Sequence, residues 1–293
     1  MRVLVIHTWG LGDMIMATPM LKSLAKSGYK VDLAITNPLN GIILKNNDFL
    51  NQIYTIKNKI DFFPLFGKYK YIISTAGTNP GKIKILGHML GAKKVFAKAQ
   101  EKNLHRIKMN LKIVKPLIDT VDEEPYIYIK SEDKTPYISG KTVGFAPGSG
   151  FRQKFKRWEG FKRLIDKMDG NKLVFLGPDE SDLKDEFSKL DVTVVEENLE
   201  DTISIISRLN LLVGNDNGLM HIGYATGINC VTVYGMTNEK ETGGYRKNNE
   251  AVFLPMSCRP CFDPATDRIG CDTIDCLKFL EVDRVLEVCQ KFL

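Results

Sequence analysis

The sequence predicts an α/β fold made of two doubly wound parallel sheets. Short apolar runs rich in β-branched residues alternate with longer amphipathic segments, the rhythm of a parallel sheet covered on both faces. That rhythm breaks over residues 119–141, where acids and two prolines dominate, and then starts again. A chain of 293 residues is also longer than a single hydrophobic core usually serves. We therefore expect an N-terminal domain over residues 1–135 and a C-terminal domain over residues 136–293.

The first domain contains five apolar runs separated by segments with helical spacing. One further short strand is expected within residues 119–141, and an inter-domain linker around 131–140. The strands are expected at residues 2–7, 30–35, 51–56, 70–75 and 93–97, and the helices at 13–26, 38–46, 80–90 and 103–118.

The second domain repeats the alternation. Its strands are expected at residues 141–147, 171–177, 191–195, 210–216 and 228–235, and its helices at 158–169, 179–189, 199–208, 218–226 and 281–293. Open α/β sheets bind ligands beyond the carboxyl ends of their strands. We therefore expect the site in a cleft between the two domains, formed by loops that follow strands.

Positive charge is concentrated in one stretch. Residues 82–115 hold nine Lys and one Arg against a single acid, Glu101. This surplus indicates an anionic partner, such as an acidic sugar or lipid headgroups, or else solvated helix faces. No recognition motif favours nucleic acid, so none is expected as a partner. No apolar run approaches a membrane span and the start does not resemble a signal peptide, so we expect a cytoplasmic protein.

The first candidate site is the turn in "HTWGLGDMIMATP", which follows the first predicted strand. Gly10 and Gly12 have the spacing that begins a dinucleotide fingerprint. Ile15 stands where that fingerprint needs a third glycine, and Asp13 puts a negative charge where a phosphate would bind. These departures weigh against a nicotinamide-dependent oxidoreductase. Asp13 is either a helix N-cap or a catalytic carboxylate.

The second candidate site is the loop "APGSGFRQKFKRW", residues 146–158. It combines the flexible turn at Ser149 and Gly150 with four cations, among them Lys156. Backbone amides next to cations suit a diphosphate, and an ordinary basic loop is the alternative.

The third candidate site is "LVGNDNGLMHIGYATG", residues 212–227, where a strand ends and a helix begins. Asn217 and Gly218 can present backbone N–H groups at the helix start. Asp216 either holds the basic loop or a sugar hydroxyl, or it caps the helix. His221, one turn further on, is either a ligand contact or a buried polar residue of the core.

The fourth candidate site is a group of four cysteines within nineteen residues. Their spacing, C-x2-C-x9-C-x4-C, can close a tetrahedral sulfur site for structural zinc or iron, with free thiols or one disulfide as alternatives. Cys230 and Cys289 read as core residues. The candidate metal ligands are Cys258, Cys261, Cys271 and Cys276.

Together these motifs resemble glycosyltransferase family 9, whose best-known members are ADP-heptose-dependent heptosyltransferases. The resemblance rests on "GLGDMIMATPMLKSL", "VGFAPGSG…FKRW", "VFLGPDE" and "LVGNDNGLMHIGYATG…TVYG", and it spans most of the chain. It implies a GT-B fold, which has two Rossmann-like domains, and inverting transfer from a nucleotide-diphosphate sugar.

The resemblance also implies a role for each site residue. Asp13 matches the general base, with Gly10 and Gly12 in the acceptor-side loop. Lys156 matches the lysine that contacts the donor phosphates, and no catalytic metal is required. The other implied donor-binding residues are Ser149, Gly150, Asp201, Asp216, Asn217, Gly218 and His221. The resemblance also implies a carboxylate that binds the donor ribose. Either Glu200 or Asp201 can match it, and Asp201 is our candidate.

The implied activity is heptose transfer from ADP-heptose to a glycan such as a lipopolysaccharide core. An anionic or lipid-linked acceptor would bring the enzyme to the inner membrane surface. A protein acceptor and a non-catalytic binding module on the same fold are the alternatives. The cysteine spacing departs from the iron-binding pattern of the protein-modifying members, so neither iron nor a protein acceptor follows from it.

Overall fold

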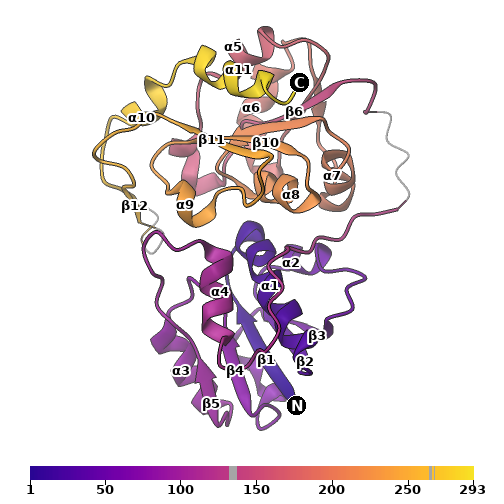
Figure 1. Ribbon diagram of the computed structural model, residues 1–293, viewed down its shortest axis with the longest axis vertical. Coiled ribbons are helices and arrows are strands. Elements are labelled where there is room, and N and C mark those ends of the chain that lie inside the picture. The colour runs from indigo at the N-terminus through magenta and orange to yellow at the C-terminus, as the bar shows by residue number, and fades with distance from the viewer. Residues whose placement is uncertain (132–136, 264–265, 267) are drawn as a thin grey trace. The chain divides into compact units, whose positions relative to one another are not determined.

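The computed structural model describes residues 1–131, 137–263, 266 and 268–293. The chain divides into two compact units, Met1–Tyr128 and Ile129–Leu293, here called unit 1 and unit 2. Each unit contains one parallel sheet with helices on both faces (Figure 1). The linker expected around 131–140 lies partly outside the described residues.

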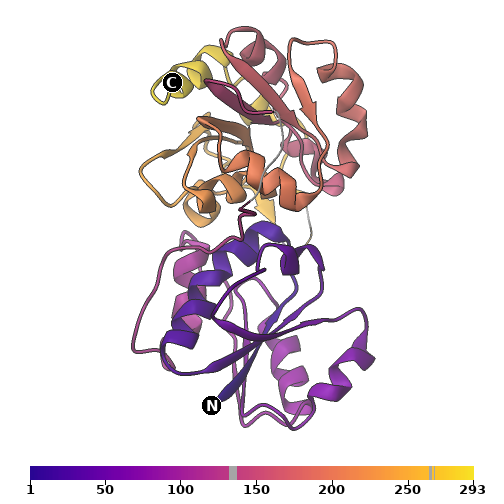
Figure 2. The ribbon, with the colours of Figure 1, turned by 90° about the vertical axis from the view of Figure 1, so that its right-hand side faces the viewer.

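Unit 1 is built on a five-stranded sheet in the order β3-β2-β1-β4-β5. The strand order reverses between β1 and β4, so the carboxyl ends of these two strands form a topological switch point. Right-handed crossovers place α1 and α2 on one face of the sheet and η1 and α3 on the other (Figure 2). The final helix, α4, packs against α1. The elements are β1 (Arg2–His7), α1 (Leu11–Lys26), β2 (Lys30–Ile35), α2 (Leu39–Ile42), β3 (Leu50–Thr55), η1 (Lys59–Leu65), β4 (Tyr71–Ser74), α3 (Pro80–Met89), β5 (Lys94–Phe96) and α4 (Arg106–Val114).

Unit 2 is built on a six-stranded sheet in the order β11-β10-β9-β6-β7-β8. Its switch point lies between β6 and β9, because β7 and β8 extend the sheet on one side and β9 starts the other. The elements of the sheet and its crossovers are β6 (Thr142–Ala146), η2 (Phe151–Lys156), α5 (Phe161–Asp166), β7 (Asn171–Phe175), η3 (Pro178–Glu180), α6 (Ser181–Phe187), β8 (Thr193–Val195), α7 (Leu199–Ile206), β9 (Leu211–Asn215), α8 (Gly218–Thr226), β10 (Asn229–Tyr234), α9 (Glu239–Thr242) and β11 (Asn249–Phe253). A C-terminal segment follows, with the hairpin β12 (Phe262–Asp263) and β13 (Arg268–Ile269), then α10 (Asp275–Lys278) and α11 (Val282–Gln290).

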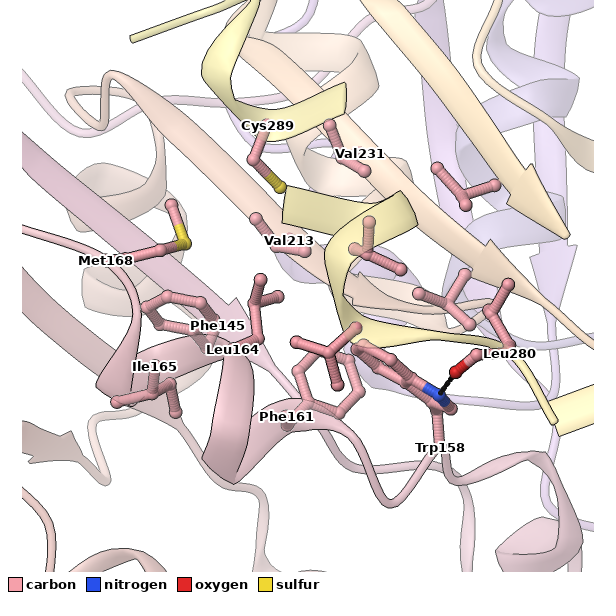
Figure 3. Close-up of a cluster of buried hydrophobic side chains, with 14 of the residues drawn as sticks. Phe145, Trp158, Phe161, Leu164, Ile165, Met168, Val213, Val231, Leu280 and Cys289 are labelled. Atoms are coloured by element: carbon pink, nitrogen blue, oxygen red, sulfur yellow. Dashed lines mark hydrogen bonds between the residues drawn. The ribbon is translucent and has the colours of Figure 1, made fainter. Parts of the chain in front are cut away.

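The core of unit 2 joins its C-terminal helix to the start of its sheet (Figure 3). Phe145 of β6 and Trp158 are buried with Phe161 of α5 and Cys289 of α11. Trp158 donates its indole N–H to the carbonyl of Leu280 at 3.1 Å, so this buried polar group is satisfied. Cys230 is also fully buried, as expected for a core thiol. The segment between β6 and α5 is thereby fixed at both of its ends.

Three local expectations are wrong, and local polar contacts explain one of them. The helix expected over 38–46 shortens to α2, because the Asn47 side chain accepts hydrogen bonds from the amides of Phe49 and Leu50 and starts a turn. The helix expected from residue 158 begins at Phe161. The short strand expected within residues 119–141 does not form in 119–131 or 137–141, and 132–136 lie outside the described residues. In the part of the chain that the structure describes, no helix has the length and apolar character to cross a membrane.

Candidate active site

The unit 1 switch point is organised by a buried histidine. His7 ends β1, and its Nδ1 lies 2.9 Å from the hydroxyl of Thr75, which follows β4. Its Nε2 lies 3.4 Å from the carbonyl of Gly10. Burial lowers the pKa of His7, and the nearby Asp13 carboxylate only partly opposes this. A neutral His7 therefore ties the two strand ends and the glycine turn together.

Asp13 lies in the first turn of α1. Gly10 is the N-cap of this helix, so the capping alternative for Asp13 is wrong. The Asp13 Oδ1 atom lies 3.4 Å from Nε of Arg106, which starts α4. The Asp13 side chain is 25% exposed and the Arg106 side chain 9%. The helix dipole and the guanidinium both stabilise a negative charge here, and the carboxylate is the more accessible partner.

Arg106 is a site residue that the sequence reasoning missed. Its Nη1 donates to Gln100 Oε1 at 3.0 Å. At Gly77 φ is +92°, a conformation that favours glycine, and a Cβ there would lie 2.8 Å from the same guanidinium, so a side chain would displace Arg106. Asn110, one turn along α4, bonds the main chain of both the β4–α3 loop and α1. The available signal was that Arg106 is the one arginine among the ten cations of residues 82–115.

The unit 2 switch point is held by two asparagines, Asn215 and Asn217, here called the asparagine clasp. Asn215 donates to the carbonyl of Pro147 at 2.6 Å and accepts from the amide of Trp158 at 3.1 Å. Asn217 donates to the carbonyl of Ala146 at 3.1 Å and to the next carbonyl but one, at residue 148, at 3.0 Å. The clasp joins the turn after β6 to the turn after β9, so the two turns can contribute to one binding surface.

Asn217 is also the N-cap of α8. Its side-chain oxygen accepts from the amides of Leu219 and Met220, at 3.0 and 3.3 Å. The alternative in which Asp216 caps this helix is therefore wrong. Gly218 is the first residue of α8 and directly follows Asn217, whose side chain bonds the turn after β6.

Lys156 lies next to Asp216. Its Nζ is 3.4 Å from Asp216 Oδ2, and the two side chains are only 11% and 12% exposed. The same ammonium lies 4.8 Å from the centre of the Phe262 ring, a cation–π contact that the sequence reasoning missed. The Asp216 carboxylate and the Phe262 ring together fix the ammonium group of Lys156 close to the end of β9.

Two further predicted donor residues are buried near this turn. Ser149 is buried, and within the described residues its hydroxyl has no hydrogen-bond partner. An unsatisfied buried hydroxyl costs free energy, so this hydroxyl is available to donate to a ligand oxygen. Gly150, next to it, is the N-cap of η2. His221 is buried edge-on to Tyr224, with ring centres 5.5 Å apart.

Asp201 lies apart from these residues in the sheet order. It is in the first turn of α7, which follows β8, two strands from β6. Its carboxylate accepts from the Asn198 side chain at 2.6 Å and pairs with Lys130 at 3.1 Å. This carboxylate therefore helps to begin a helix, and Glu200 precedes it in the same turn.

The four predicted metal-ligating cysteines share one neighbourhood as free thiols. Burial raises the pKa of Cys261 and of Cys276, and nearby thiols of the same group act in the same direction. Cys258 is exposed and Cys271 half-buried. Across the described ranges, no three His, Cys, Asp or Glu side chains are grouped to hold a metal ion. The thiols as placed thus do not fit the expected tetrahedral site.

Known heptosyltransferases resemble this chain in sequence and in fold. A lipooligosaccharide heptosyltransferase 2 of Campylobacter jejuni is 23% identical over 98% of this chain and 97% of its own length. The ADP-heptose lipopolysaccharide heptosyltransferase II of E. coli superposes with a TM-score of 0.77 at 15% identity, over 100% of this chain and 98% of that one. A glycosyl transferase family 9 protein of Veillonella parvula gives 0.76 at 19% identity, over 99% and 96%.

The superpositions show the fold, which is GT-B, with two doubly wound α/β units. The family model for glycosyltransferase family 9 (heptosyltransferase) matches residues 88–269, more than half of the chain. This match runs from α3 to the β12–β13 hairpin and includes Arg106, Lys156 and the asparagine clasp. The chain therefore belongs to glycosyltransferase family 9, the heptosyltransferase family, and is a glycosyltransferase.

Proposed function

We propose that this enzyme transfers a heptose from ADP-heptose, with inversion at the anomeric carbon, to a glycan of the lipopolysaccharide-core type. The observation that carries the proposal is Asp13: an accessible carboxylate at a strand switch point, held by Arg106. The donor follows the ADP-heptose named for the E. coli structural relative, and the acceptor class follows the lipooligosaccharide of the Campylobacter relative.

In this proposal Asp13 is the general base. Its free carboxylate oxygen takes the proton from an acceptor hydroxyl while that oxygen bonds to the anomeric carbon. The bond from the anomeric carbon to the diphosphate oxygen breaks on the opposite face, and ADP leaves. Arg106 is a positioning residue, because it orients Asp13 rather than contacting the reacting atoms.

Lys156 and its surroundings serve the leaving group. Negative charge grows on the diphosphate as the bond breaks, and the Lys156 ammonium stabilises it. Asp216 and the Phe262 ring hold that ammonium in place before the donor binds. The unpaired hydroxyl of Ser149 and the amide of Gly218 at the start of α8 are further donors for phosphate oxygens. These groups supply positive charge without a divalent ion.

The main test changes the base and leaves its surroundings. Asp13→Asn should keep the fold and the affinity for ADP but lower kcat at least about 100-fold, the usual contribution of a general base. Glu101→Gln is the matched control, since Glu101 is an exposed carboxylate of the same unit that also has a cationic partner, Lys112. Turnover near that of the wild type in Asp13→Asn would refute the assignment.

A second test addresses donor and acceptor. ADP-heptose should raise the melting temperature more than NAD or UDP-sugars do, because only the preferred donor binds the native state tightly. The product formed from a β-linked donor should carry an α-linkage by NMR. Transfer to a protein but not to a lipid-linked or phosphorylated glycan would support the protein-acceptor alternative instead.

Metal binding by the four cysteines has a test of its own. The thiols would have to rearrange to bind zinc or iron, because no suitable group is present in the ranges that the structure covers. Elemental analysis of protein purified under reducing conditions should show about one metal atom per chain if they do. Metal-free protein with full thermal stability would rule out a structural metal.

A further inference from the structure

One face of unit 1 carries unusually exposed apolar side chains. In the 3-10 helix η1, side chains three residues apart point the same way. Ile60, Phe63 and the following residue Phe66 have this spacing, and all three are exposed, whereas Leu65 is buried. The outer stripe of η1 is thus apolar, and its inner side packs on the sheet.

Helix α3 has the same arrangement. Ile83 and Gly87 face the sheet, while Ile85 and Met89, four residues apart, form an exposed stripe. The exposed apolar side chains of η1 and α3 are 64–82% accessible, which no requirement of the core explains.

Elements η1 and α3 belong to one layer. Both crossovers run toward β5, and so both cover the same face of the sheet. The amide of Gly67, just after η1, donates to the carbonyl of Leu90, just after α3, at 2.9 Å. Leu65 of η1 and Ile83 of α3 share one buried cluster beneath them. Their outer stripes therefore form one surface.

This surface is surrounded by positive charge. Residues 57–98 contain nine lysines against one acid, Asp61, and all nine lysines are exposed. The lysines belong to η1, to α3, to the adjoining turns and to β5 with the segment after it. The amide of Lys93 bonds the carbonyl of Lys70 at 2.9 Å, so the turns before β4 and β5 lie side by side. We call this surface the apolar–basic face: Ile60, Phe63, Phe66, Ile85 and Met89, with Lys57, Lys59, Lys68, Lys70, Lys82, Lys84, Lys93, Lys94 and Lys98.

We propose that the apolar–basic face docks on an anionic lipid bilayer. Its apolar stripes enter the interface between headgroups and acyl chains, and its lysines lie at the level of the anionic headgroups. A second copy of the chain fits less well, because a symmetric contact would place nine lysines against nine lysines. An RNA would use the lysines and could stack bases on Phe63 and Phe66, but it would leave the aliphatic side chains Ile60, Ile85 and Met89 exposed to water. Large exposed apolar patches with a polar rim mark interaction sites.

The inference deepens the proposed function, since an enzyme with a lipid-linked acceptor meets it at a membrane. Vesicle binding is measured without donor or acceptor, so its failure and a failure of transfer are separate results. The wild-type protein should co-sediment with vesicles of phosphatidylglycerol and phosphatidylethanolamine. It should bind at least about tenfold less to pure phosphatidylcholine, and less at high salt, because headgroup charge supplies much of the attraction.

Two variants separate the stripes from the lysines. Phe63→Ser/Met89→Ser should lower the partition coefficient at least about tenfold, because two inserting side chains are lost. Leu39→Ser/Phe279→Ser, also exposed apolar positions, is the control and should bind as the wild type does. Lys82→Gln/Lys84→Gln/Lys93→Gln/Lys94→Gln should bind about tenfold less, and Lys189→Gln/Lys240→Gln/Lys247→Gln/Lys278→Gln, with the same charge change, should not.

All of the substituted side chains are exposed, and unchanged melting temperatures would verify folding. Equal binding of wild type and Phe63→Ser/Met89→Ser would overturn the proposal. So would equal losses in the two quadruple lysine variants. A wild-type dimer in sedimentation velocity that becomes monomeric in Phe63→Ser/Met89→Ser, with no vesicle binding, would identify a second copy as the occupant instead.

Discussion

The two switch points have the same topology and opposite chemistry. In each unit the first strand is paired on both sides, and the loops after it and after the later neighbour meet at the carboxyl edge. In unit 1 an ion pair leaves the carboxylate of Asp13 more exposed than its cation, Arg106. In unit 2 the pair Lys156–Asp216 is buried about equally and the cation also meets a ring. In each unit the sheet brings the strand ends together, and the counter-charge comes from helix α4 in unit 1 and from the turn after β9 in unit 2.

The largest expected effect comes from removing the unit 2 cation. Lys156→Ala should lower kcat/KM about 100- to 1000-fold, the range for loss of one group that stabilises a developing anion. Affinity for ADP, measured by calorimetry, should fall as well. Lys154→Ala, which removes an exposed lysine two residues away, is the control. Unchanged ADP affinity in Lys156→Ala would show that unit 2 does not offer a cation to the diphosphate at this switch point.

The counter-charge of unit 1 should matter less. Arg106→Ala should lower kcat about tenfold, because Asp13 loses its orienting partner but keeps the helix N-terminus. Arg106→Lys should retain more activity, and ADP affinity should stay unchanged in both variants. If Arg106→Ala instead weakens ADP binding, Arg106 contacts the donor and the division of labour between the two units fails.

Acid should destabilise unit 1 through His7. Burial lowers the pKa of His7 in the folded protein, so the unfolded chain binds the extra proton first. Stability is therefore lost as the pH falls below about 6.5, by at most about 1.4 kcal/mol per pH unit for one proton. Urea unfolding at pH 7.5 and 5.5 should show a smaller pH effect in His7→Gln than in the wild type. The exposed His88→Gln should behave as the wild type does.

The smallest effect is expected at Ser149. Its buried hydroxyl has no partner among the described residues, so Ser149→Ala should leave the free protein as stable or slightly more stable. The same variant should bind ADP a few-fold more weakly, by about one hydrogen bond. Thermal unfolding with and without ADP measures both effects. A clear loss of stability without ADP would mean that the hydroxyl serves the fold and not the donor.

Most of the fold could be predicted because hydrophobic periodicity reports burial directly. Every strand expected in the two sheets forms, since a strand covered on both faces must be apolar throughout. The short 3-10 elements and β11 were missed, because η1 shows its apolar stripe to solvent and β11 is a half-exposed edge strand. Sequence patterns assign apolar residues to the core by default, and here that rule does not hold.

The candidate site was predicted where its residues lie beside a strand end in the sequence. Asp216 directly follows β9, whereas Asp13 and Lys156 lie six and ten residues beyond the ends of β1 and β6. All three could be found because they lie in segments that follow strands. Their partners could not, because Arg106 is 93 positions from Asp13 in the chain, and Phe262 lies in the short hairpin strand β12, 106 positions from Lys156. The choice of N-cap depended on backbone angles that single residues do not reveal: Gly10 precedes α1, and Asn217, not Asp216, caps α8.

The asparagine clasp has an entropic consequence. Asn215 and Asn217 bond four carbonyl and amide groups of a segment 57 to 71 residues away, so the turn after β6 is ordered before any donor arrives. Ordering a loop upon binding is a cost that subtracts from affinity, and a preformed loop avoids it. The rate of donor association should accordingly be limited by diffusion and desolvation rather than by a slow ordering of the turn after β6.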